Sequence, residues 1–373
     1  MLSVNFLVDA ILLYCLIAFV LNLFYFRWIS QAGSQGQDDK ISVLIPVRNE
    51  EKKLARCLDS LLNQSYRNLE IIVMDDHSDD ASWKILSEYQ AAGKLRAFRS
   101  TALPDGWSGK NWACHQLSLH ATGSWLAFVD ADTVHAEDSI QRAYEEAVAR
   151  GASMVSYLPD LVTVSVAEKV VIPVLYLAFY VFFPLAFLRG FKDRNAALAI
   201  GTFILMRRDV YDRVGGHGAL RDEIVEDMHL ARLVKAEGQG VELLDGTGRL
   251  FTRFYSSAAE IWQGFSKNTF GAFGYTIAPA VATLTACYFV LLNPFVRFAL
   301  SPAWDLSNPF FTQILLILFI RLALAVRTRH SILSVIFHPV MVCFALGFAF
   351  NSIWKIARGS PVAWKGRAYK ITR

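Results

Sequence analysis

Two acidic pairs follow apolar runs in the first half of the sequence and could face one ligand crevice. The run in "SWLAFVDADTVH" (124–135) leads to Asp130 and Asp132, and the run entering "VMDDHSDD" (73–80) leads to a pair that ends in Asp76. A carboxylate is costly to bury without a partner, so a positive charge is expected beside Asp130 and Asp132. Asp130 and Asp132 are expected on the same face of an extended strand, where they could share a divalent cation. The alternative is two solvated aspartates in a turn.

Two further motifs carry groups suited to phosphate binding and proton transfer. In "GWSGKNWACHQL" (106–117) a glycine-flanked turn places Lys110 at the start of a predicted helix, where an ammonium and unpaired N–H groups suit a phosphate. This motif is not a Walker loop. In "EIVEDMHLARLVKAEG" (223–238) Glu226 and Asp227 lie in a first helical turn. They could stabilise the helix dipole, or one of them could be a general base.

Alternating strand and helix patterns surround these residues and must position them. The alternation predicts an α/β domain with a mainly parallel sheet, in which ligands bind outside the carboxyl ends of the strands. The predicted strands and helices, in order, are "ISVLIPV" (41–47), "EEKKLARCLDSLLNQ" (50–64), "LEIIVMDD" (69–76), "SWKILSEYQAAG" (82–93) and "LRAFR" (95–99).

The chain as a whole is too apolar for an ordinary soluble enzyme. Its hydrophobic content is 54% and its mean hydropathy is +0.33, and Phe6–Phe26 is long enough to cross a bilayer, which needs about 20 helical residues. A cleaved signal peptide is the alternative for this run. Further candidate spans are Tyr275–Leu300, Pro309–Val326 and Ile332–Ile353. We therefore expect an N-terminal transmembrane helix (1–30), a catalytic domain (40–260), an interfacial helix (261–275), C-terminal transmembrane or re-entrant helices (276–354) and a basic tail (355–373).

Basic residues predict the orientation of these parts in the cell's inner membrane. Arg27 and Lys40 follow the first span, so the catalytic domain and the basic tail are expected in the cytoplasm, beside anionic membrane lipids. Three full crossings after Glu260 would place the tail outside. We therefore expect the stretch broken at His338 and Pro339 to re-enter on one side. The segment 168–190, between the acidic motifs, is expected to be interfacial because one crossing there would separate them.

The remaining composition excludes several classes of protein. The five cysteines have no C-x-x-C spacing, so neither a disulfide framework nor a thiolate metal site is expected. No basic stripe interleaved with aromatic residues is present, so no nucleic-acid partner is expected.

Taken together, these motifs resemble the membrane-bound family-2 glycosyltransferases with a GT-A fold. The resemblance covers Ile41–Phe270 and rests on the ordered motifs "ISVLIPVRNEE", "VMDDHSDD", "GWSGKNWA", "FVDADT", "RRDVYDRVGGH" and "VEDMHLARLVKAEG". "GWSGKNWACHQL", "WQGFSKNTF" and "WKGRAY" are most similar to the branch with bacterial carotenoid- and hopanoid-associated enzymes. The resemblance to this family implies a GT-A, Rossmann-like nucleotide-diphospho-sugar transferase domain with transmembrane helices.

The resemblance also implies roles for individual residues. The nucleotide-sugar site would include Pro46, Asn49, Glu50, Asp76 at the uracil, Lys110 at the diphosphate and Asp130. Mg²⁺ or Mn²⁺ would be bound by Asp132 with Asp130. Asp227, paired with Glu226, would be the catalytic base that deprotonates the acceptor hydroxyl. The expected activity is that of an inverting, metal-dependent hexosyltransferase that uses a UDP-sugar.

The acceptor is expected to be a lipid that receives a single sugar. The Q-x-x-R-W motif of processive polysaccharide synthases is absent, since Ser266 and Lys267 stand in the Arg and Trp positions after Gln263. A processive synthase is nevertheless the nearest alternative, and a membrane scaffold that binds nucleotide-sugar without turnover is another. Residues expected to contact the acceptor are Trp262 and, in the tail "VAWKGRAYKITR", Trp364, Lys365 and Arg367.

Overall fold

The computed structural model describes most of the chain and divides it into two compact units. It describes the backbone of residues 2–28, 39–188, 190–191, 193–273, 276–301, 308–358, 362–364 and 367–369. Unit 1 comprises Met1–Tyr25, Leu161–Ala186 and Phe254–Arg373, and unit 2 comprises Phe26–Asp160 and Phe187–Arg253. All the acidic motifs predicted from the sequence lie in unit 2.

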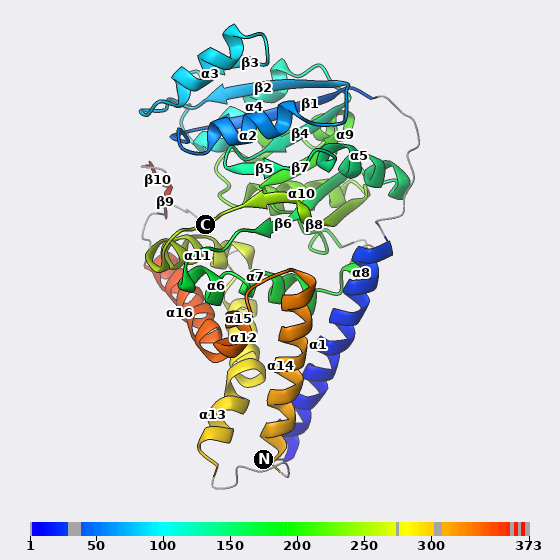
Figure 1. Cartoon of the computed structure of the whole chain (residues 1–373), viewed down its shortest axis with the longest axis vertical. Helices are drawn as coiled ribbons and strands as arrows, with labels where there is room; N and C mark the ends of the chain where they lie inside the picture. Colours follow the sequence, from blue (N-terminus) through cyan, green and yellow to red (C-terminus); the bar gives the residue numbers. More distant parts are fainter. Residues whose placement is uncertain are drawn as a thin grey trace. The chain divides into compact units, whose positions relative to one another are not determined.

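An eight-stranded sheet forms the centre of unit 2, with the strand order β3-β2-β1-β4-β7-β6-β8-β5 (Figure 1). The strands are β1 Ile41–Val47, β2 Leu69–Asp75, β3 Arg96–Arg99, β4 Trp125–Val129, β5 Thr133–His135, β6 Met154–Leu161, β7 Phe203–Arg207 and β8 Val241–Thr252. β3, β2, β1 and β4 pair in parallel, as predicted. The remaining pairs of known register are antiparallel, so the sheet is mixed rather than mainly parallel. The alternation that predicts parallel pairing is present only in the first part of the domain.

Helices cover the sheet and bring the motif residues to it. They are α2 Leu54–Leu62, α3 Ser82–Ala91, α4 Gly109–His120, α5 Ser139–Arg150, α9 Arg208–Arg213, the 3₁₀ helix η3 Gly216–Leu220 and α10 Glu226–Ala236. The Ser108 hydroxyl caps α4 by accepting from the N–H of Asn111, which satisfies one of the unpaired donors at a helix start. Lys110 therefore lies in a first helical turn, as the sequence predicts.

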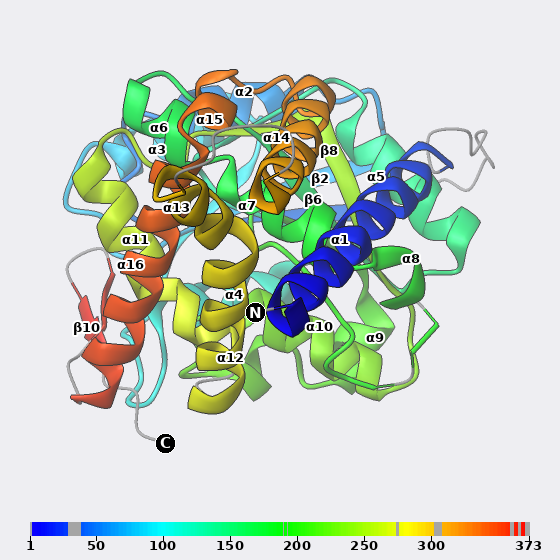
Figure 2. The same ribbon diagram turned by 90° about the horizontal axis from the view of Figure 1, so that it is seen from below.

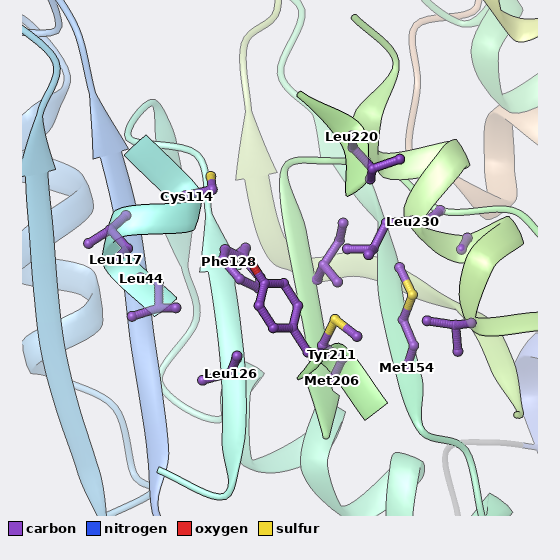
Figure 3. Packing of buried hydrophobic residues seen from close by; sticks show 14 of the residues in the cluster. Leu44, Cys114, Leu117, Leu126, Phe128, Met154, Met206, Tyr211, Leu220 and Leu230 are labelled. Carbon is purple, nitrogen blue, oxygen red and sulfur yellow. The ribbon is translucent and has the colours of Figure 1, made fainter. Parts of the chain in front are cut away.

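One hydrophobic core fixes α4, α9 and α10 against the sheet (Figure 3). The Phe128 ring of β4 packs 5.3 Å from the Tyr211 ring of α9. Leu117 of α4 and Leu230 of α10 are fully buried in the same cluster. Each such side chain contributes about 1.5–3 kcal/mol when fully buried. This packing determines where the first turns of α4 and α10, which carry Lys110 and Glu226, can lie.

Unit 1 is helical and is assembled from three separate parts of the sequence (Figure 2). Its elements are α1 Leu2–Trp28, α6 Val166–Val171, α7 Val174–Leu177, the π-helix η2 Ala178–Phe182, α11 Ala258–Ala272, α12 Ile277–Cys287, the π-helix η4 Tyr288–Leu292, α13 Asn293–Ala299, α14 Pro309–Arg327, α15 Leu333–Ile336, α16 His338–Ala357 and the pair β9 Val362–Trp364 and β10 Arg367–Tyr369. The short α8 Leu185–Leu188 lies where the chain passes to unit 2. Among the described residues, three helical stretches are long and apolar enough to cross a membrane: Asn5–Phe26, Ile277–Ala299 and Pro309–Arg327.

The segment 168–190 is broken into short helices, and α1 supplies hydrogen bonds at the break. The Asn22 side chain is fully buried, and its amide donates to the carbonyls of Tyr180 at 2.9 Å and Phe183 at 2.6 Å. Its Oδ1 atom accepts from the N–H of Leu185 at 2.9 Å. Backbone groups left unpaired where a helix ends are thereby satisfied, which is essential where water is scarce. α1 is thus a packed part of unit 1.

Candidate active site

Lys110 connects two of the predicted acidic motifs. Its Nζ atom lies 2.8 Å from Asp130 Oδ1 and 2.7 Å from Glu226 Oε1. Burial acts to lower the pKa of Lys110, but the charges of Asp130 and Glu226 outweigh burial and hold that pKa well above its ordinary value. The residue is therefore a fixed cation between the end of β4 and the start of α10.

Asp227 lies beside this ion pair and is held by backbone groups. Its Oδ2 atom accepts from the N–H of Gly201 at 2.7 Å, and Oδ1 accepts from the N–H of Met228 at 2.8 Å. Burial and then the neighbouring charge of Glu226 raise the pKa of Asp227 to about 6. Burial also acts to raise the pKa of Glu226, but Lys110 outweighs it and lowers that pKa below its ordinary value. The two adjacent acids are thus chemically distinct, and Asp227 has the pKa suited to a general base.

A consequence for pH dependence follows from the pKa of Asp227. We expect kcat/KM for the sugar transfer that the resemblance implies to fall about tenfold per pH unit below pH 6, because the protonated carboxyl cannot accept a proton. Transfer rates measured from pH 4.5 to 8, with nucleotide binding followed in parallel, test this. An acidic limb centred near pH 4, the ordinary range of an aspartate, would contradict the assignment.

Gly201 leaves room for both Asp227 and Lys110. A Cβ atom at this position would lie 3.3 Å from Asp227 Oδ2 and 3.3 Å from Lys110 Nζ, closer than most such contacts. We expect Gly201→Ala to displace Asp227 by a few tenths of an ångström and to lower kcat up to about tenfold, since small misplacements of catalytic groups are costly. Nucleotide affinity should change little. Gly190→Ala, where the nearest atom would be at 3.6 Å, is the matched control for kinetic measurements.

Asp130 and Asp132 lie in a turn, and the predicted extended strand is wrong here. β4 ends at Val129, and the N–H of Thr133 donates to the carbonyl of Asp130 at 3.2 Å, which closes the turn. The two side chains contact different lysines. Lys110 pairs with Asp130, whereas Lys53 Nζ lies 3.0 Å from Asp132 Oδ2. Both carboxylates therefore lie beside a cation, as the cost of burying them requires.

Four of the predicted nucleotide-binding residues lie toward the carboxyl ends of β1 and β2: Pro46, Asn49, Glu50 and Asp76. The backbone of Asn49 is left-handed (φ 53°), its N–H donates to Ser78 Oγ at 3.0 Å, and its Oδ1 atom accepts from the N–H of Asp79 at 2.8 Å. The N–H of Glu50 donates to Ser82 Oγ at 2.9 Å. These bonds connect the loops that follow the two strands.

Asp76 is buried next to these loops. Its side chain lies 3.9 Å from Arg48 Nη1, which also donates to the Asp76 carbonyl at 2.6 Å. Pro46 is opposite Met74 in the parallel register of β1 and β2. Asp76 is only 3% exposed, so a base could reach it only at its edge.

The predicted acceptor residues all belong to unit 1. Trp262 lies on α11 in unit 1, where it is 37% exposed and its ring contacts Phe344 of α16 edge-on at a centroid distance of 6.3 Å. The backbone of Arg367 pairs with that of Trp364 between β10 and β9. The side chains of both tail residues, and all of Lys365, lie outside the described residues.

Three residues of the cluster were not predicted from the sequence: Lys53, Arg48 and Gly201. Lys53 belongs to "EEKKLARC", which has the pattern of an exposed helix start, and Gly201 lies in a stretch with no motif. Arg48 stands two residues after Pro46 in the motif "ISVLIPVRNEE". Of the three residues, it alone could have been proposed as a site residue from its place in the sequence. Contacts between distant segments, which a single sequence does not show, bring all three to the site.

The mixed sheet of this order, with acidic groups and a lysine gathered where β4 ends, matches the GT-A fold. Residues 42–215 match the family described as "Glycosyl transferase family 2", so this part of the chain carries a family-2 glycosyltransferase domain. The sequence-based prediction of this family and of the α/β GT-A fold is confirmed.

Curated relatives are similar to this chain over most of its length, and a solved structure shares its fold. The chain is 24% identical over 347 residues to a 4,4'-diaponeurosporenoate glycosyltransferase of Staphylococcus aureus, covering 89% of each protein. It is 30% identical over 235 residues to the enzyme of the same name from Staphylococcus haemolyticus, covering 61% of this chain and 60% of that one. The mannosyltransferase PcManGT of Pyrobaculum calidifontis, solved with GDP-Man and Mn²⁺, superposes with a TM-score of 0.51 at 18% identity, covering 93% of this chain and 99% of that one. This structural similarity, at 18% identity, shows a shared fold and nothing about activity.

Proposed function

We propose that the protein is an inverting glycosyltransferase that transfers one sugar from a UDP-sugar to a hydrophobic acceptor at the membrane. The observation that carries the proposal is the cluster of Lys110, Asp130, Glu226 and Asp227, in which a base of suitable pKa lies beside a cation fixed by two carboxylates. Asp227 accepts the proton of the acceptor hydroxyl while that oxygen bonds to the anomeric carbon. The bond from this carbon to the diphosphate breaks on the opposite face and UDP departs, which inverts the configuration.

The chemistry of Asp130 and Asp132 fits a hard divalent cation. Two carboxylates alone are an incomplete ligand set, and the described residues contain no group of three or more His, Cys, Asp or Glu side chains that could hold a metal ion. Mg²⁺ and Mn²⁺ sites are commonly completed by substrate phosphates and water. PcManGT was solved with Mn²⁺. A bound Mg²⁺ or Mn²⁺ would neutralise charge on the departing diphosphate.

The donor site is proposed at the carboxyl ends of β1 and β2. Asn49 and Glu50 connect the loops there, and Asp76 presents its edge to the uracil. Lys110 would approach the diphosphate, because it lies in the first turn of α4 and is held in its charged form.

The acceptor proposal rests on the membrane helices and on the relatives. The relatives are named for a carotenoid acid, which supports an apolar lipid as acceptor; for this chain we propose a carotenoid or hopanoid-type lipid that offers a hydroxyl group. With the catalytic domain in the cytoplasm, the three candidate spans return the chain to that side after Arg327, provided that α16 does not cross. Trp262 and the basic tail would then be available to a lipid acceptor on the catalytic side of the inner membrane.

The direct test measures products of the full-length chain in lipid nanodiscs. UDP-sugars are supplied singly with a bacterial lipid extract and Mn²⁺, and UDP release and glycolipids are measured by mass spectrometry. We expect lipid-dependent UDP release and a product with one added sugar. A ladder of products would establish a processive synthase, and nucleotide binding without any release of UDP would establish a scaffold.

A further inference from the structure

Two lysines neutralise the Asp130 and Asp132 carboxylates, but they are held very differently. Lys110 contacts two carboxylates, at 2.8 Å and 2.7 Å, and its side chain is 22% exposed. Within the described part of the chain, Lys53 contacts one carboxylate, at 3.0 Å, and its side chain is 45% exposed. An exposed single ion pair contributes little free energy, typically about 0–1 kcal/mol, so it is readily exchanged. Lys53 is therefore the replaceable cation of the pair.

A divalent cation at Asp132 and the Lys53 ammonium compete for the same charge. Lys53 Nζ lies 3.0 Å from Asp132 Oδ2, so a divalent cation held by Asp132 would place a second positive charge beside the ammonium. Like charges in close proximity repel one another in a partly buried site. Metal binding would therefore weaken the ion pair of Lys53 with Asp132 and free the flexible lysine side chain for another anion.

We propose that Lys53 is a donor-binding residue that exchanges partners, leaving Asp132 for the diphosphate of the sugar donor when the divalent cation binds. The inference rests on the proposed function and extends it to a residue outside the predicted site. The exchange makes metal and donor bind together: the ion pair opposes metal binding alone, whereas the freed ammonium adds a charged contact once the diphosphate is present. Lys53 thus lowers the affinity for the metal alone and raises the affinity for the sugar donor in the presence of the metal.

The test uses Lys53→Gln in the full-length chain and measures binding in the absence of turnover. Mn²⁺ affinity without nucleotide, measured by electron paramagnetic resonance, is expected to rise about twofold to fivefold, because the competing ion pair is lost. UDP affinity at saturating Mn²⁺, measured by calorimetry, is expected to fall about tenfold or more, because a charged hydrogen bond is lost. Lys53→Arg retains the charge and should restore most of both values.

The neighbouring Lys52 provides the matched control, since it is exposed in the same helix start and forms no ion pair with the described acidic residues. Lys52→Gln should leave both affinities unchanged. Unchanged affinities in Lys53→Gln, or a change of the same sign for Mn²⁺ and UDP, would overturn the partner exchange while leaving the proposed function standing. Failure of the unaltered protein to bind Mn²⁺ or UDP would overturn both.

Discussion

Replacing Asp227 with asparagine is expected to slow sugar transfer by about 10²–10⁴-fold, the usual effect of losing a general base. The amide cannot accept the acceptor proton, although it can still accept the N–H of Gly201, which now lies 2.7 Å from the carboxylate. UDP affinity should therefore stay within about twofold of the original, since no donor contact is removed. The measurement combines single-turnover kinetics with UDP calorimetry on the same protein.

Protein stability provides the control for this variant. The folded-state pKa of Asp227 is raised to about 6 from 3.8, so the ionised carboxylate disfavours the fold above pH 6, and this cost disappears below about pH 4. Asp227→Asn should accordingly unfold at the same or a higher temperature than the unaltered protein at pH 8.

The size of the kinetic loss also identifies the acceptor group. An acceptor carboxylate is already ionised at neutral pH and needs no base. A loss of only a fewfold would mean that the reacting oxygen is of this kind, and the role of Asp227 proposed here would be wrong.

Replacing Asp132 with asparagine is expected to abolish detectable transfer while the fold is retained. A neutral amide cannot balance the charge of a divalent cation, and loss of metal assistance removes several kcal/mol of transition-state stabilisation. Mn²⁺ binding, measured by electron paramagnetic resonance, should be lost with it. Asp212→Asn is the control, because this aspartate on α9 is 61% exposed and, among the residues that the structure describes, forms an ion pair only with the nearby Arg208.

Two results would contradict the metal assignment. One is transfer by the unaltered protein that persists in an excess of chelator. The other is an Asp132→Asn variant that binds Mn²⁺ normally but unfolds at a lower temperature, which would mean that Asp132 serves the fold through Lys53. The ion pair between them is half-exposed on the lysine side, so its loss alone should have little effect on stability.

The parallel half of the sheet could be predicted from the sequence because its signals are local. Apolar runs bounded by polar loops gave β1, β2 and β3, and glycines followed by an amphipathic pattern gave the start of α4. The antiparallel strands β6, β7 and β8 pair across long connections, and no local pattern encodes such pairing.

In the candidate site, too, some features have local sequence signals and others depend on long-range packing. Asp130, Asp132, Glu226 and Asp227 were found because acidic groups after apolar runs need an explanation. The turn that separates Asp130 from Asp132, and the lysine that each one contacts, depend on packing between α2, α4 and β4. A single sequence shows which groups require partners, but it does not show which partners the fold supplies.

The discontinuity of unit 1 has a consequence for how the protein is made. Asp9 of α1 accepts a hydrogen bond from Gln313 of α14 at 2.7 Å, and these residues are 304 positions apart in the chain. At about 5–20 residues per second, α1 waits roughly 15–60 seconds between its own synthesis and that of this partner. Throughout that interval α1 carries an aspartate without its hydrogen bond to Gln313, while unit 2 is synthesised and can fold first. Assembly of unit 1 is therefore expected to finish only after unit 2 has been made, because the last helices of unit 1 follow unit 2 in the chain.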